Sequence, residues 1–133
     1  MTHRVVQPDG WPRPKGYANG VAARGTVIAV AGQVGWDATQ RMVPGGMAAQ
    51  ARQALANVVA VLRAAGAGPE HLVRMTWYVT DRAAYRAASR EIGAAFRELV
   101  GHYAIAMSAV QVTALMEDDA VVEIEATAVV PDA

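Results

Sequence analysis

A strict alternation of residues near the end of the chain constrains the fold more than any other feature. From Val121 to Val130 every second residue is aliphatic, and the residues between them include two glutamates, Glu123 and Glu125. Successive side chains of a β-strand point to opposite faces, so the pattern predicts a strand with one apolar face and one mixed face. The apolar face requires a covering layer of helices, whereas the mixed face suits a subunit contact that holds polar pockets.

Two stretches with helical periodicity supply such a covering layer. Between Met47 and Ala65 apolar residues recur every three or four positions, and two glycines and a proline follow as stop signals. A second helix is expected to begin after Asp81, its N-cap, and to run to about Val100. Each helix therefore has one apolar stripe that can pack on a sheet.

Apolar and β-branched runs predict the strands, which we expect at Arg4–Gln7, Tyr17–Ala23, Thr26–Gln33, His71–Thr80, Met107–Ala114 and Ala120–Val130. The second and third runs are separated by a turn that contains glycine and are expected to form a hairpin. The segments 8–16 and 34–46 are rich in turn formers and are expected to be loops. The order β, β, β, α, β, α, β, β fits an α/β (α+β) fold: a single mixed sheet with two helices on one face, in one domain of residues 1–133.

Composition limits both the environment and the function. The 133 residues (14.0 kDa) carry 12 Lys plus Arg and 12 Asp plus Glu, 53% hydrophobic and 18% charged residues, and no cysteine. These values exclude a disordered tail, a coiled coil, a strongly basic nucleic-acid binder and any disulfide, thiolate nucleophile or cysteine zinc site. No apolar run approaches the roughly 18 to 20 residues needed to cross a bilayer, so we expect a soluble, cytoplasmic protein without a membrane partner.

Glu123 and Glu125 are the best candidates for acid or base chemistry. A strand places residues two apart on the same side, about 7 Å from each other. If a partner subunit excludes water from that face, a carboxylate there could transfer protons near neutral pH. The competing interpretation is a pair of solvated or ion-paired sheet carboxylates, and spacing alone favours it.

Other catalytic patterns are missing from the sequence. His3, His71 and His102 are scattered without ligand spacing, so we expect no metal. Ser89 and Ser108 do not lie in a GxSxG elbow, and no phosphate-binding loop or other cofactor motif is present. Eleven of the twelve basic residues are arginines spread without a run, which gives little support to RNA binding.

Three aromatic residues fall in expected loops or at a strand start: Trp11, Tyr17 and Trp36. An isolated Trp or Tyr most often caps the core. Tyr17, which follows a glycine at the start of a strand, could equally offer its hydroxyl to a ligand.

Six segments of the chain together resemble the RidA/YjgF family. They are GYANGV (16–21), AGQVGWD (31–37), AQARQALANVVAVLRAAGA (49–67), LVRMTWYVTD (72–81), SAVQVTAL (108–115) and VEIEATAV (122–129). Members are reactive enamine and imine deaminases, labelled in older usage as translation inhibitors or endoribonucleases. The resemblance covers nearly the whole chain and implies a chorismate-mutase-like subunit in a homotrimer, with clefts between neighbouring subunits.

The resemblance also implies positions for the site. The cleft tyrosine of the family corresponds to Tyr17, its strand-end glycine to Gly32 and its cleft glutamate to Glu123. Glu123 would be the catalytic residue that holds the attacking water, and Tyr17, Gly32, Trp36 and Met107 would contact the substrate. We expect two adjacent chains to contribute these residues to one cleft.

Met107 is the main departure from the family pattern. The deaminase subgroup has an arginine before the serine of its ARS motif, which clamps the substrate carboxylate, and this chain reads AMS. Ala31 and Ser89 replace a serine and an asparagine of the family. Losing the clamp should cost about 2 to 3 kcal/mol in binding, unless another arginine such as Arg74 reaches across the interface. We therefore expect little activity on 2-aminoacrylate and favour a larger, less anionic or aromatic-derived imine or enamine.

Two other functions remain open at this point. A member without the arginine could be a non-catalytic trimer that binds a small ligand or another protein. RNA cleavage is the third possibility, and the neutral charge without a basic stripe counts against it. A screen of freshly generated imines separates catalysis from binding without turnover.

Overall fold

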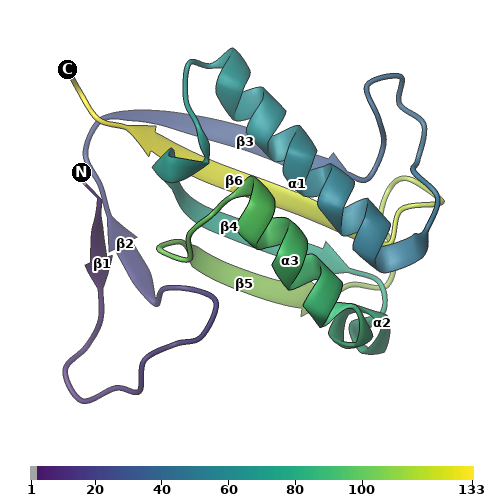
Figure 1. The fold of residues 1–133 in the computed structure, drawn as a ribbon, viewed down its shortest axis with the longest axis horizontal. Coiled ribbons are helices and arrows are strands. Elements are labelled where there is room, and N and C mark those ends of the chain that lie inside the picture. Colours follow the sequence, from purple (N-terminus) through teal and green to yellow (C-terminus); the bar gives the residue numbers. More distant parts are fainter. Residues whose placement is uncertain (1–2) are drawn as a thin grey trace.

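A computed structural model describes residues 3–133, and Figure 1 shows a twisted sheet with helices on one face. Strands β3 (Thr26–Val34), β6 (Val122–Val130), β4 (Leu72–Val79) and β5 (Ala106–Gln111) form this sheet in that order. Strand β6 pairs antiparallel with β3 and β4, whereas β5 runs parallel to β4. The prediction of a mixed sheet with helices on one face is confirmed for these four strands, whereas the first two expected strands lie outside the sheet.

Helices α1 (Gly46–Ala64) and α3 (Ser89–Leu99) cover one face of the sheet, and a short 3-10 turn, η1 (Pro69–His71), precedes β4. Their apolar stripes meet the alternating side chains of the strands, as the helical period requires. Burying each large aliphatic side chain contributes roughly 1.5 to 3 kcal/mol. None of the helices within residues 3–133 is both long and apolar enough to span a membrane. The largest fully buried side chains include Leu55, Leu62, Leu72, Met75, Ile105 and Ile124.

The predicted hairpin between residues 17–23 and 26–33 is wrong. Strand β2 (Gly20–Ala22) pairs instead with β1 (Arg4–Val6) in a separate two-stranded ribbon, and β3 pairs with β6. Gly25 has φ 145°, and a Cβ there would lie 2.7 Å from the carbonyl carbon of Val130. The chain therefore turns close to the end of β6, where only glycine fits. Strands β3 and β6 both have nine residues and can pair along their whole length, whereas β2 has only three.

The predicted second helix is interrupted at Ala88. Asp81 caps it as expected, because its Oδ1 accepts a hydrogen bond from the Ala84 amide at 3.1 Å. Helix α2 (Arg82–Ala87) ends there, since Ala88 has ψ 6° instead of roughly −42°. The axis changes direction, and Figure 1 shows α2 nearly end-on beside α3.

A buried glutamine ties α1 to the start of β6. The Gln50 side chain donates to the Asp119 carbonyl at 3.0 Å and accepts from the Val121 amide at 2.9 Å. Gln50 is only 6% exposed, and both halves of its amide are satisfied. This connection fixes the strand that carries the two candidate glutamates.

Candidate functional site

Gly32 and Glu123 lie together on the sheet face that the helices leave open. The pairing of β3 with β6 shifts register so that Ala31 and Gly32 together oppose Glu125, which is a β-bulge. A Cβ built on Gly32 would lie 2.7 Å from the carboxyl carbon of Glu123. Only a residue without a side chain lets this carboxylate rest against the β3 backbone without moving.

The two glutamates of β6 differ in their partners. The Tyr78 hydroxyl donates to Glu125 Oε1 at 2.6 Å, and this hydrogen bond is the main reason why the pKa of Tyr78 is raised. No hydrogen bond to the Glu123 carboxylate is found within residues 3–133, and its side chain is half-buried. Arg74, the suggested alternative clamp, lies on the same open face and is exposed. Glu123 is thus available to hold a water or a proton, whereas Glu125 is engaged.

Tyr17 and Met107 line a cavity on the helix side of the sheet. The cavity has a volume of about 610 Å³ and is bounded by α2, α3 and the edge strand β5. The Ala18 amide donates to the Ile105 carbonyl at 2.9 Å, so the segment that carries Tyr17 runs beside the start of β5. Met107 packs partly buried against the core. Ser89, at the start of α3, lines the same cavity.

Met107 and Glu123 point to opposite faces of the sheet. Met107 is paired in register with Met75, which is fully buried under the helices, and Glu123 is paired with Tyr78. Residues three apart on a strand face opposite sides. One chain therefore brings Gly32 to Glu123, and Tyr17 to Met107, and it does not bring the two groups together.

Trp36 lies in the loop that follows β3, four residues beyond Gly32 and outside the cavity. Its carbonyl accepts a hydrogen bond from the Asn57 side chain at 2.8 Å, which attaches the loop to α1. The Thr39 hydroxyl donates to the Asp37 carboxylate at 2.6 Å, and this bond is the main reason why the pKa of Asp37 is lowered. These two hydrogen bonds hold the loop in place beside the end of β3 where the bulge lies.

None of the three histidines lines the cavity that holds Tyr17 and Met107, although His102 and Tyr17 border a neighbouring hollow. Their ring nitrogens contact backbone groups at Val129, Gly68 and Pro69, for His3, His71 and His102 respectively. In the part of the chain that the structure describes, no three His, Asp or Glu side chains are placed to hold a metal ion.

Trp11 does not cap the core, because its side chain is 61% exposed.

The aromatic lining of the cavity was missed by sequence reasoning. Trp77 and Phe96 are buried in the core and Tyr85 packs against it, and the same three rings also line the cavity. The signal that could have indicated an opening is Gly93, a glycine in the middle of α3. A glycine inside a helix is unfavourable and often has a packing or functional reason.

The chain is similar to known proteins over nearly its whole length. The family model described as Endoribonuclease L-PSP matches residues 12–130. A RutC family protein of Synechocystis is 35% identical over 134 residues, which cover 98% of this chain and 99% of the relative. The crystal structure of YyfB from Yersinia pestis, a Rid-family protein of unknown function, has a TM-score of 0.83 and 36% identity, and the match covers 98% of this chain and 100% of that one.

The chain belongs to the RidA/YjgF family. One relative of this Rid protein is named as an enzyme. The 2-iminobutanoate/2-iminopropanoate deaminase of Escherichia coli K12 is 36% identical over 113 residues, which cover 85% of this chain and 86% of that enzyme. The family resemblance seen in the sequence is therefore confirmed.

Proposed function

We propose that this Rid protein is a homotrimer that hydrolyses a reactive imine or enamine to a carbonyl compound and ammonia in clefts between its subunits. The observation that carries the proposal is the placement of an unengaged carboxylate, Glu123, against the backbone of Gly32 on an open sheet face. The named activity of the Escherichia coli relative supports the reaction class.

Glu123 supplies the proton transfers that this reaction needs. Water attacks the carbon of the C=N bond while Glu123 accepts a proton from that water. That proton passes to the nitrogen and gives a carbinolamine. Glu123 then moves the second water proton from the hydroxyl to the nitrogen, the C–N bond breaks, ammonia leaves and the oxygen forms the new C=O bond. An enamine enters this sequence as its imine tautomer, after a proton moves from nitrogen to carbon. The Gly32 backbone beside the carboxylate orients the substrate, and the reaction consumes one water for each ammonia released.

The division of the candidate residues between two faces supports a cleft made by two copies. The open face carries exposed aliphatic side chains, with Val27 at 65% and Val110 at 45% exposure. Exposed apolar surface of this kind marks a contact with another protein surface. If the open face of each copy meets the cavity of the next, Glu123 and Gly32 come to lie opposite Tyr17 and Met107, and a closed ring of three repeats this site three times.

Met107 determines which substrates the cleft should reject. A thioether replaces the guanidinium that would pair with the carboxylate of a small imino acid. We infer low activity on 2-aminoacrylate and higher activity on imines or enamines that bind through a larger apolar part.

The proposal is tested with imines generated freshly from several amino acids by an amino-acid oxidase, with ammonia release measured with and without the protein. Glu123→Gln should lower turnover at least about 100-fold, because a positioned acid or base contributes about that much or more. Glu125→Gln is the matched control on the same strand and should keep most of the activity.

Two results would contradict the proposal. If Glu123→Gln turned over imines as fast as the wild type, Glu123 would be structural. If the wild-type trimer bound metabolites and hydrolysed none of the imines, the non-catalytic ligand-binding function would be favoured instead.

A further inference from the structure

The cavity on the helix side, which we call the aromatic pocket, is larger and more aromatic than a three-carbon imino acid requires. Its volume of about 610 Å³ is in the range of about 300 to 1,000 Å³ that accommodates whole organic ligands. Five of its 13 lining residues are aromatic: Tyr17, Trp77, Tyr85, Phe96 and Tyr103.

The rings of the aromatic pocket hold one another in place. The ring centroids of Trp77 and Tyr85 are 6.0 Å apart in an edge-to-face arrangement, and those of Phe96 and Tyr103 are 5.2 Å apart and stacked. Such pairs prefer fixed geometries, so the wall is formed before a ligand arrives. Burial raises the pKa of Tyr85, which keeps this part of the wall uncharged.

Gly93 keeps the pocket wide along α3. A Cβ built on Gly93 would come no closer than 3.4 Å to another group, the Nη1 atom of Arg97, which is an ordinary contact. The packing of the chain therefore does not require a glycine at this position. The space beside the helix backbone belongs to the pocket, and a large side chain at residue 93 would occupy it.

Lys15 is the one charged residue among those that line the pocket, and it is the only lysine of the sequence. The single ion pair found within residues 3–133 joins Arg52 to Glu98, so no carboxylate of the described chain is paired with Lys15. An apolar pocket with one cation at its wall suits a ligand that has an apolar body and one anionic group.

We propose that the aromatic pocket selects imino acids with an aromatic side chain, and that Lys15 binds the carboxylate that has no guanidinium partner at Met107. This inference rests on the proposed imine hydrolysis, because it names the substrate class of the same cleft. The aromatic ring of the substrate packs against the wall that includes Trp77 and Phe96. Lys15 is a specificity-determining residue and takes no part in the proton transfers assigned to Glu123.

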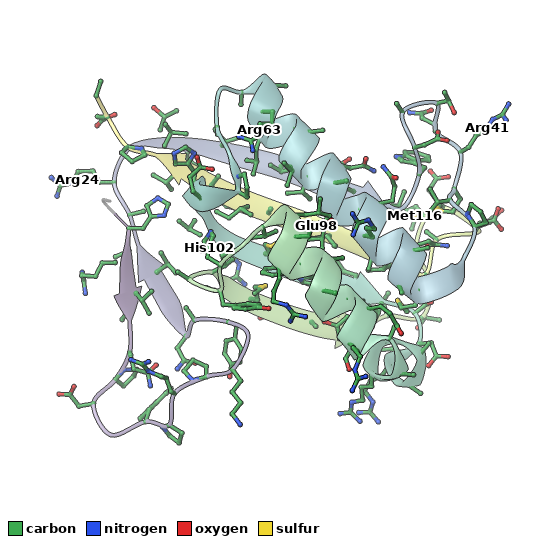
Figure 2. The ribbon with its side chains drawn as sticks, in the orientation of Figure 1. Arg24, Arg41, Arg63, Glu98, His102 and Met116 are labelled. Carbon is green, nitrogen blue, oxygen red and sulfur yellow. The ribbon has the colours of Figure 1, made fainter. Side chains whose placement is uncertain are left out.

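The first test measures binding of 2-keto acids, the products of such a reaction, by titration calorimetry. Phenylpyruvate should bind at least about tenfold tighter than 2-oxobutanoate, since ring burial adds more than the 1.4 kcal/mol that corresponds to a factor of ten. Lys15→Gln should weaken phenylpyruvate about tenfold and leave the neutral ketone phenylacetone unchanged. Arg24→Gln, which removes an exposed cation that does not line the pocket and that lies at the left edge of Figure 2, should change neither.

The second test fills the pocket from α3. Gly93→Leu should weaken phenylpyruvate at least about tenfold and spare 2-oxobutanoate, because only the larger ligand needs the space beside the helix. Ala94→Leu adds the same side chain one position along, where the residue is exposed and lies outside the pocket, and should have no effect. Equal affinity for the two keto acids, or phenylpyruvate binding that does not respond to Lys15→Gln, would overturn the inference.

The two tests distinguish an error in the aromatic specificity from an error in the proposed imine hydrolysis. If small imines are hydrolysed but phenylpyruvate binds no better than 2-oxobutanoate, the aromatic specificity is wrong and the hydrolysis stands. If phenylpyruvate binds through Lys15 and no imine is hydrolysed, the pocket assignment stands and the catalytic proposal is wrong.

Discussion

The two faces of the central sheet differ in the side chains that they present. The helix side ends in a cavity whose aromatic rings fix one another and whose one charged lining residue is Lys15. The open side presents small and aliphatic residues around the carboxylates of β6, and one of them, Glu125, is already bonded to Tyr78. In the proposed function, recognition chemistry lies on one face and proton-transfer chemistry on the other. A single chain cannot use both on one ligand, which makes assembly a requirement of the proposed activity.

The largest expected effect comes from disrupting the open face. Val27 is 65% exposed in one chain and lies on the open face that we assign to the subunit contact, so Val27→Asp would place a charge in that contact. The variant should sediment and scatter as a single chain of 14.0 kDa, whereas we expect three times that mass for the wild type. Imine hydrolysis by the variant should fall to background.

Met116→Asp is the control for this experiment, because Met116 is 94% exposed in the loop before β6 (Figure 2). It should leave both mass and activity unchanged. A trimer that persists with full activity in Val27→Asp would show that the open face is not the contact.

The elements with a strong internal period were predictable from the sequence. The helix expected from Met47 to Ala65 is found at Gly46–Ala64, and the alternation of the last strand is found in β6. Strand pairing was not predictable in the same way. The partner of β3 is β6, about 100 residues further along the chain, and the turn residues around Gly25 give no indication of that pairing.

The candidate site shows the same limit. Family resemblance located Tyr17, Gly32, Met107 and Glu123 along the chain, but only the register of the strands shows that Met107 and Glu123 face opposite sides. Spacing could not separate Glu123 from Glu125 either, since the distinction depends on Tyr78 from a neighbouring strand. Contacts between residues distant in sequence carry this information.

A smaller effect is expected on stability from the pocket side. Gly93→Ala should raise the free energy of unfolding by about 0.5 to 1 kcal/mol, because alanine restricts the unfolded chain and suits a helix interior. Its Cβ meets only the Arg97 guanidinium, at an ordinary 3.4 Å. Urea unfolding at equal protein concentration measures the change, and Ala94→Gly on the same helix should lower stability by a similar amount. A loss of stability in Gly93→Ala would mean that packing, not the pocket, requires the glycine.

The smallest effect concerns pH and the open face. The hydrogen bond to Glu125 raises the pKa of Tyr78 above its ordinary value of 10.0. A raised pKa in the folded state means that this contact contributes stability below the unfolded pKa and loses it as the pH rises through the folded pKa. In Glu125→Gln, NMR titration should show the Tyr78 pKa shifted back toward 10.0.

Tyr85 provides the internal control for this titration. Burial, and not Glu125, raises the pKa of Tyr85, so its titration should be the same in the wild type and in Glu125→Gln. An unchanged Tyr78 titration would show that the Tyr78–Glu125 bond does not persist in solution.

The most direct test of a site shared by two copies is complementation in mixed oligomers. Glu123→Gln removes the proton-transfer residue, and Tyr17→Asp places a repelling charge in the aromatic pocket, so each variant alone should be inactive. When the two chains are refolded together in equal amounts, about one site in four should combine an intact pocket with an intact Glu123 from the neighbouring copy, because each site draws on two chains independently. We predict recovery of about a quarter of wild-type imine hydrolysis. Mixed trimers that form and stay inactive would contradict the account.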